Sequence, residues 1–205
     1  MNFEGKHNRH PETTLFVYGT FRRGCWNYDR FCRGVLSVEE AVVRGRLYEL
    51  PSGIPVLEVP EADVLAHGTA DPLTDAATQA RFARDLASIL EPVPDKSAGQ
   101  RIWTCQRHAR RVRAMDGEHQ SATAGDCGPV YGELLTFDDP ETCLPAIDRL
   151  EGFHPGGSSL YRRVLVPVCI AHGMVLPVWV YVAGGFLERS ALRKQEGTTW
   201  NPGPR

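Results

Sequence analysis

Short runs of β-branched and aromatic residues dominate both ends of the chain. Residues 14–18 (TLFVY) are followed at once by Gly19, and residues 41–50 are mostly apolar and end at the sequence PSGIP. Three later runs have the same composition: residues 130–137, 161–170 and 175–182. Apolar runs of this length, bounded by Gly and Pro, predict buried β-strands.

Two segments instead show helical periodicity. Residues 75–90 carry an apolar face at positions i, i+4, i+7 and i+8, formed by Phe82, Leu86, Ile89 and Leu90. Residues 142–150 predict a short helix in which Thr142 is the N-cap and Pro145 falls in the first turn, where proline is tolerated. The fold class expected is therefore α/β (α+β), with a mixed or barrel-like sheet and few helices.

The middle of the chain differs from both ends. Residues 61–128 are polar and rich in Ala and Arg, so we interpret them as an insertion made of helix 75–90 plus loops. This insertion splits a single domain formed by residues 14–60 and 129–190. Polar segments at either end are predicted to be a disordered N-terminus and a C-terminal tail: residues 1–13 and 191–205.

Composition narrows the function classes. The chain has 205 residues and a net charge of −2, which argues against a globally basic nucleic-acid-binding protein. No apolar run approaches the roughly 20 residues that span a bilayer, and the polar start gives no sign of a secretory signal peptide. We therefore expect no membrane partner, a cytoplasmic protein, and six cysteines that remain thiols, because none forms a Cys-x-x-Cys pair.

The first candidate for chemistry is the junction after the first strand, residues 18–21 (YGTF). A glycine at the end of a buried strand permits close approach of a ligand to the backbone. Successive backbone N–H groups in such a turn can form a concave anion site. A tight turn that needs glycine explains the same pattern, and spacing alone favours that simpler interpretation.

The second candidate is Glu151. It shares one helix face with Leu144 and Ile147, at spacings i, i+3 and i+7, so its carboxyl group is expected to be partly buried. Burial raises the pKa of a carboxyl group toward the range that is useful for proton transfer. The alternative is a carboxylate at a frayed helix end that Gly152 turns toward solvent, and spacing does not separate the two.

Weaker groupings also occur, in the insertion and after Glu151. Four residues of zinc-ligand type lack a recognised spacing and are more simply scattered polar side chains: Cys105, His108, His119 and Cys127. A basic run fits a solvated face better than a nucleic-acid site: Arg101, Arg107, Arg110, Arg111 and Arg113. His154 could assist proton transfer, but a surface loop histidine is the simpler interpretation.

Four sequence blocks, taken in order, resemble the gamma-glutamyl cyclotransferase-like family, also called avirulence-induced-gene-like. The first is residues 14–24 (TLFVYGTFRRG), and the second joins VYGEL at residues 130–134 to IDRLEGF at residues 147–153. The closing blocks are LYRR at residues 160–163 and WVYV at residues 179–182. The resemblance covers roughly residues 14–60 and 129–183.

The resemblance implies a small mixed β-barrel with flanking helices and assigns roles to particular residues. Glu151 corresponds to the family's general acid/base, and two tyrosines fall where members place pocket residues, Tyr161 and Tyr181. The loop that cradles the gamma-glutamyl group corresponds to Tyr18, Gly19, Thr20 and Phe21. Two departures bear on specificity: Phe21 stands where an aliphatic residue is usual, and the insertion replaces a short connection.

The function expected from the resemblance is a cofactor-free and metal-free gamma-glutamyl cyclotransferase that acts on a small molecule. It would release 5-oxoproline from a gamma-glutamyl amide whose leaving group is an amino acid, an amine or a peptide. The alternative is a non-catalytic small-molecule-binding or adaptor protein on the same fold. We also expect helix 75–90 to pack on the barrel while the polar flanks of the insertion overhang the pocket, with a peripheral position as the alternative. Neither the leaving group nor the oligomeric state is indicated.

Overall fold

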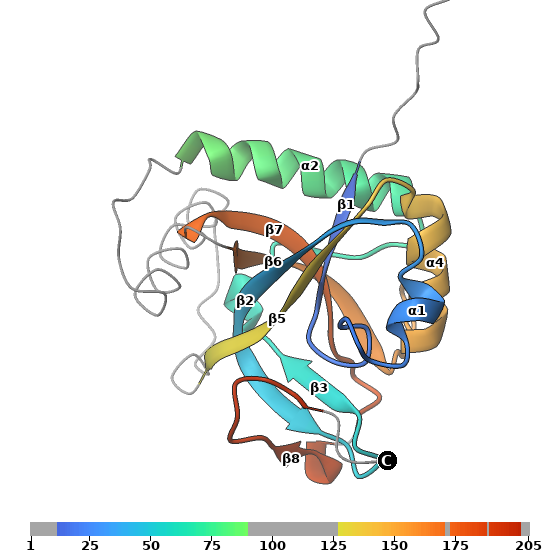
Figure 1. Cartoon of the computed structure of the whole chain (residues 1–205), viewed down its shortest axis with the longest axis vertical. Coiled ribbons are helices and arrows are strands. Elements are labelled where there is room, and N and C mark those ends of the chain that lie inside the picture. The colour runs from blue at the N-terminus through green and yellow to red at the C-terminus, as the bar shows by residue number, and fades with distance from the viewer. Residues whose placement is uncertain (1–11, 90–126, 171–172, 188, 202–205) are drawn as a thin grey trace, which may run out of the picture.

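Five of the strands close into a barrel. The computed structural model describes residues 12–89, 127–170, 173–187 and 189–201. The strand order is β2–β5–β1–β7–β6, and the pairing of β6 with β2 closes the barrel (Figure 1). The five strands are β1 (Thr13–Val17), β2 (Val35–Glu49), β5 (Gly128–Phe137), β6 (Tyr161–Ile170) and β7 (Val175–Ala183). Every pairing is antiparallel except β1 with β7, which is parallel. The predicted mixed barrel is confirmed.

Smaller elements extend this barrel, and the sequence analysis did not predict them. β3 pairs with the distal half of β2, β8 pairs with β2 as well, and β4 pairs with β6. The described residues also form short helical turns: α1, and 3-10 helices at Glu61–Asp63 and Arg189–Ala191. The bounds of the labelled elements are β3 (Pro55–Glu58), β4 (Ala66–His67), β8 (Arg193–Lys194) and α1 (Tyr28–Phe31).

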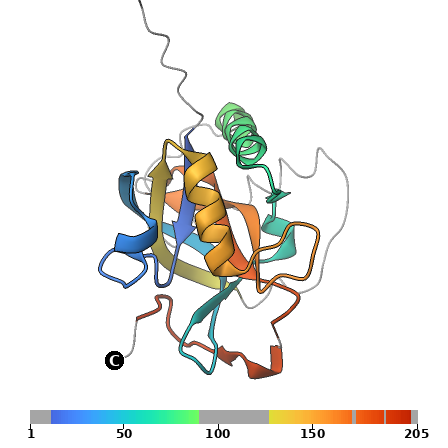
Figure 2. The ribbon, with the colours of Figure 1, turned by 90° about the vertical axis from the view of Figure 1, so that its right-hand side faces the viewer.

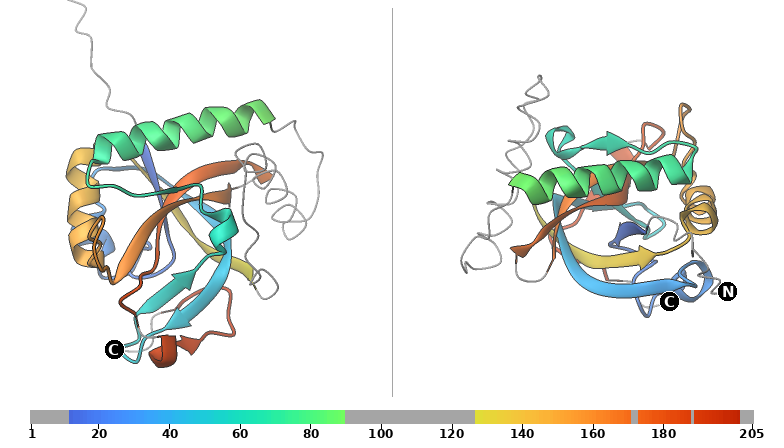
Figure 3. Two further views of the ribbon diagram at one scale, coloured as in Figure 1. Left: turned by 180° about the vertical axis from the view of Figure 1, so that it is seen from behind. Right: turned by 90° about the horizontal axis from the view of Figure 1, so that it is seen from above.

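The long helix α2 (Pro72–Ile89) lies across the outside of the barrel, over β7 and beside α4 (Figure 3). It begins at Pro72, three residues before the expected start. Asp71 is the reason, because its carboxylate accepts hydrogen bonds from the N–H groups of Leu73 and Thr74 at 3.0 and 3.2 Å. An Asp followed by Pro at the first helical position is a strong start signal. Leu86 is buried as expected, whereas the side chains of Ile89 and Leu90 lie outside the described residues.

The helix α4 (Pro140–Glu151) runs along one side of the barrel (Figure 2). The prediction of Thr142 as N-cap is wrong, because the side chain of Asp139 caps the helix by accepting a hydrogen bond from the Thr142 N–H at 3.0 Å. Pro145 consequently lies inside the helix rather than in its first turn. At the other end, Gly152 adopts the left-handed conformation (φ 61°) that commonly ends a helix.

The alternation of β1 divides the core into two layers. Phe16 and Tyr18 point into a cluster to which all five barrel strands contribute, so this cluster fills the barrel. Leu15 and Val17 point the other way, into a second cluster that includes Leu144 and Ile147 of α4. The barrel wall is therefore packed on both faces, and the end of β1 lies between the interior and α4.

Several expectations concern residues outside the described ranges. The basic run, three members of the supposed zinc set and most of the supposed overhang lie there, so they stay predictions. Within the described ranges, Cys25, Cys32 and Cys143 are free thiols, in agreement with the sequence analysis. The described helices include none that is long and apolar enough to cross a membrane. The division of the chain into domain, insertion and tails also stays a prediction.

Candidate active site

All seven residues singled out from the resemblance line one cavity of about 40 Å³. Tyr18 and the turn that follows come from the end of β1, Glu151 from the last turn of α4, and the other two tyrosines from β6 and β7. The seven are Tyr18, Gly19, Thr20, Phe21, Glu151, Tyr161 and Tyr181. Sequence reasoning missed Ile54 and Pro55, which also line this cavity at the start of β3.

The turn after β1 is held in place from several sides. The Arg22 N–H donates to the Gly19 carbonyl at 3.1 Å, and the Asn27 side-chain amide donates to the Thr20 hydroxyl at 2.8 Å. From β5, the buried carboxylate of Glu133 accepts hydrogen bonds from the backbone N–H and the Nε of Arg23, at 2.8 and 3.2 Å. The turn is therefore a preformed part of the cavity wall.

This turn presents backbone donors. Among the described residues, none accepts a hydrogen bond from the backbone N–H of Gly19, Thr20 or Phe21. Three successive N–H groups without a protein acceptor form the kind of concave donor array that binds a carboxylate or an oxyanion. The YGTF turn therefore has three backbone donors to offer, and its role as an anion cradle stays a prediction.

Gly19 is required by close packing rather than by an unusual backbone angle. A Cβ atom built at this position would lie 2.6 Å from Cγ of Pro55, far inside van der Waals contact. Pro55 is part of the opposite cavity wall. Any larger residue at position 19 would consequently push the two walls apart, even before a substrate is bound.

Glu151 has the electrostatics of a proton-transfer group. Its side chain is only partly exposed, and burial, reinforced by the nearby Asp148 carboxylate, raises its pKa from 4.5 to about 7. The structure therefore supports the partly buried interpretation and not the solvent-facing one. A carboxyl group with a pKa near neutrality can both accept and return a proton at physiological pH.

The three cavity tyrosines all donate their hydroxyl protons to protein acceptors. Tyr18 donates to the Tyr181 carbonyl at 2.9 Å, and Tyr161 to the Pro55 carbonyl at 3.1 Å. Tyr181 donates to the Asp148 carboxylate at 2.5 Å. Burial raises the pKa of all three hydroxyls, so they keep these protons. The Tyr18 oxygen already accepts a hydrogen bond from the Leu57 N–H at 3.2 Å. The oxygens of Tyr161 and Tyr181 can consequently only accept further hydrogen bonds, which suits a substrate amine or ammonium.

The cavity thus has two chemical sides. The backbone turn offers hydrogen-bond donors, whereas the carboxyl group of Glu151 and the tyrosine oxygens offer acceptors. A zwitterionic α-amino acid group carries an acceptor and a donor on one carbon and matches that arrangement. No group of His, Cys, Asp and Glu side chains suited to a metal ion occurs within the described ranges.

Sequence reasoning also missed the groups directly behind the cavity. Arg163 of β6 is fully buried and contacts the carboxylates of Asp75 and Asp148. A signal for it was present: Arg163 alternates with Tyr161 and Leu165 on the helix-facing side of a strand that is otherwise largely apolar. His154, by contrast, is exposed and does not line the cavity, and its Nδ1 lies 3.1 Å from the Gly152 carbonyl oxygen.

Comparison with known proteins identifies relatives of this chain. The family described as "Gamma-glutamyl cyclotransferase, AIG2-like" matches residues 15–84 and 91–202. No curated protein matches the sequence. A crystal structure of an AIG2-like protein from Mus musculus is 15% identical, with 96% of this chain and 98% of that chain covered and a TM-score of 0.48. A crystal structure of YkqA from Bacillus subtilis is 17% identical, with 92% of this chain but only 39% of that chain covered and a TM-score of 0.45.

Proposed function

Because the chain belongs to the gamma-glutamyl cyclotransferase, AIG2-like family, we propose that it releases 5-oxoproline from a small gamma-glutamyl amide. The observation that carries the proposal is one cavity lined both by Glu151, with a pKa of about 7, and by the turn at residues 19–21 after β1. We call this turn, with its three backbone N–H groups, the donor turn. An enzyme of this kind needs no nucleophilic side chain and no cofactor, since the substrate's own α-amine is the nucleophile.

Binding would begin with the α-amino acid end of the substrate. Its α-carboxylate accepts hydrogen bonds from the N–H groups of Gly19, Thr20 and Phe21. Its α-ammonium group lies against Glu151 and the oxygen of Tyr181, whose proton is already donated to Asp148. Holding both groups folds the chain so that the α-nitrogen approaches the γ-carbonyl carbon, and this positioning supplies a large part of the rate enhancement.

The chemical step transfers protons through a single carboxyl group. Ionised Glu151 accepts a proton from the α-ammonium, and the freed amine attacks the γ-carbonyl carbon to form the new C–N bond of a five-membered ring. The bond to the leaving nitrogen then breaks as protonated Glu151 donates to that nitrogen. The ring nitrogen gives up its second proton to the same carboxylate, which passes it to the released amine, so that Glu151 ends ionised as it began. The products are 5-oxoproline and an amine, an amino acid or a peptide.

The direct test is incubation of the purified protein with gamma-glutamyl compounds that differ in the leaving group. Mass spectrometry would detect 5-oxoproline, with a Glu151→Gln variant as the control. Release by the wild type and loss in the variant would support the proposal. Tight binding of a compound without any 5-oxoproline would favour the alternative, a binding protein that retains the fold.

A further inference from the structure

The side chain of Arg163 lies behind the cavity and joins three parts of the fold. It is 0% exposed and donates to both oxygens of Asp148 on α4, at 2.6 and 2.7 Å. It also donates to the Asp75 carboxylate on α2 and to the Thr69 carbonyl, the latter at 3.0 Å. We call Asp75, Asp148 and Arg163 the Arg163 cluster.

One end of the Arg163 cluster reaches the cavity. Asp148 lies one helical turn before Glu151 on α4, and its carboxylate also accepts the hydrogen bond from Tyr181, a cavity residue. Asp148 therefore connects the buried guanidinium to both the acceptor side of the cavity and the last turn of α4. Displacement of Asp148 would release the Tyr181 hydroxyl and move Glu151.

The other end of the cluster is anchored in α2. The carboxylate of Asp75 is 1% exposed and accepts hydrogen bonds from the backbone N–H and the hydroxyl of Thr69. Asp75 does not line the cavity. Its only route to the chemistry among the described contacts is through Arg163 and Asp148.

Burying the charges of Asp75 and Arg163, with Asp148 mostly buried beside them, is a poor way to stabilise a fold. Removing charged groups from water is expensive, and an apolar replacement of a buried ion pair is often as stable or more stable. The cluster also carries two negative charges against one positive charge. A cluster that only held the fold together would not need this excess of negative charge. A site that must keep a neighbouring carboxyl group protonated near pH 7 would use it, because a nearby negative charge raises the pKa of a carboxyl group.

We propose that Asp75 and Arg163 are positioning residues of the active site, which act through Asp148 to hold Tyr181 and to set the charge next to Glu151. The effect of this inference on turnover rests on the proposed function. The inference assigns to α2, a helix that contributes no cavity residue, an influence on the reaction that is transmitted by Arg163 and Asp148.

The direction of that influence follows from the charges around Glu151. They are Asp148 on its own helix and, beyond Asp148, Arg163 with Asp75. The other titratable neighbours, Tyr18 at the end of β1 and Tyr161 on β6, stay protonated and neutral. When Asp75 is neutralised, Asp148 is the one carboxylate of the cluster that still pairs with the Arg163 guanidinium. The negative field at Glu151 then weakens, and its carboxyl group ionises at lower pH.

The test is Asp75→Asn, with Asp63→Asn as the matched control. Asp63 forms a buried ion pair with Arg44 at 3.3 Å but does not line the cavity. The titration midpoint of Glu151 is followed by NMR of 13C-labelled glutamate carboxyl groups, and the Glu151 signal is assigned by its loss in Glu151→Gln. We expect the midpoint to fall by about half a pH unit or more in Asp75→Asn and to stay unchanged in Asp63→Asn, although both variants melt at lower temperature.

An unchanged midpoint in folded Asp75→Asn would overturn the proposal and leave the cluster as a structural staple. If Asp75→Asn does not fold, Asp148→Asn tests the same contacts, and an unchanged midpoint there has the same consequence. The titration needs no turnover, so it decides the inference even if no gamma-glutamyl compound is a substrate. Where turnover is present, the acidic limb of the kcat/KM profile should shift in parallel, and Asp75→Glu should restore it.

Discussion

At the scale of single residues, Glu151 is placed by α4 where solvent access is low and a second carboxylate is close. If it is the acid/base, Glu151→Gln keeps the shape of the side chain and removes the proton carrier. We expect turnover to fall roughly 100-fold or more, in line with general acid–base contributions, while the thermal transition stays cooperative. A steady-state assay on any accepted substrate checks this, and wild-type turnover in the variant would rule the role out.

The raised pKa of Glu151 also makes a prediction about stability. Its pKa is about 7 in the folded protein and close to 4.5 in the unfolded chain, so the folded state binds more protons between these values. Stability contributed by this group is therefore present below about pH 4.5 and is lost as the pH rises to about 7. We expect Glu151→Gln to melt at increasingly higher temperature than the wild type across that window. A difference in melting temperature that does not change with pH would contradict the raised pKa.

Gly19 allows the donor turn to lie against Pro55. We expect Gly19→Val to abolish binding of a gamma-glutamyl ligand, because its side chain must displace the opposite cavity wall. A cooperative thermal transition should remain. Gly128→Ala is the matched control, since a Cβ atom there would meet nothing within 4 Å. Calorimetric titration measures both variants, and wild-type affinity in Gly19→Val would exclude the cradle interpretation.

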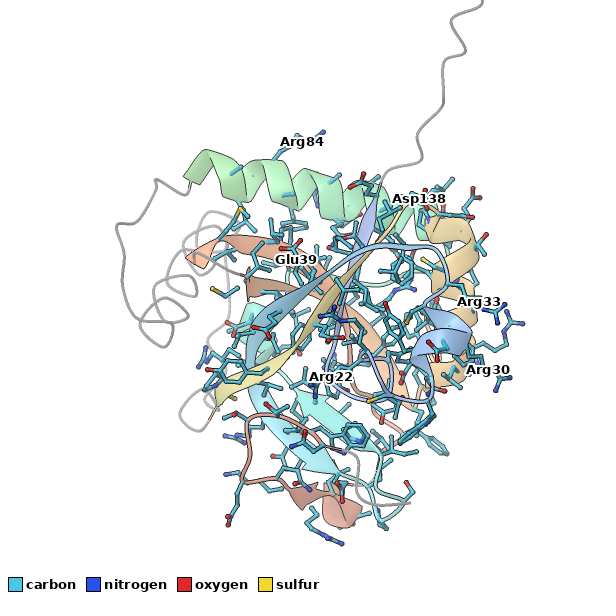
Figure 4. All side chains as sticks on the ribbon, viewed as in Figure 1. Arg22, Arg30, Arg33, Glu39, Arg84 and Asp138 are labelled. Carbon is cyan, nitrogen blue, oxygen red and sulfur yellow. The ribbon has the colours of Figure 1, made fainter. Side chains whose placement is uncertain are left out.

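At the scale of elements, α2 depends on one buried apolar stripe to stay on the barrel. Leu86 is 1% exposed, and the helix it belongs to packs over β7. We expect Leu86→Ala to lower the free energy of unfolding by about 2–5 kcal/mol, the usual range for a large-to-small change in a core. Arg84, which points away from the barrel in Figure 4, provides the control, because Arg84→Ala should change stability little. Equal effects in a denaturant titration would mean that α2 is not packed through this face.

At the scale of the whole molecule, the end of the chain returns to the barrel and contacts the donor turn. The buried indole of Trp200 belongs to the cluster that fills the barrel. The backbone carbonyl of Trp200 accepts a hydrogen bond from the Arg22 guanidinium at 2.9 Å. We expect Trp200→Ala to lower the free energy of unfolding by about 3–5 kcal/mol and to weaken ligand binding through the loosened turn. Phe186→Ala, at a residue that is 71% exposed, is the control. Unaltered stability in Trp200→Ala would show that this contact is dispensable.

Local sequence was sufficient for much of this protein. The five apolar runs became the five barrel strands, with β6 at the predicted bounds, because a short apolar run between turn residues is a property of neighbouring residues alone. The spacing of Leu144, Ile147 and Glu151 likewise placed one carboxyl group at the edge of the core. The short strands β3, β4 and β8 were missed, since they have too few residues for any period and exist only by pairing with β2 or β6.

The tertiary structure alone decided which distant groups meet. Barrel closure between β2 and β6 and the parallel pairing of β1 with β7 depend on contacts far apart in sequence, for which no local pattern carries information. The same holds for Pro55 against Gly19, and for Asp75 and Asp148 around Arg163. Sequence could name Glu151 as a candidate, but only burial and the charges brought around it by the fold set its pKa, because desolvation and Coulomb interactions depend on distance in space.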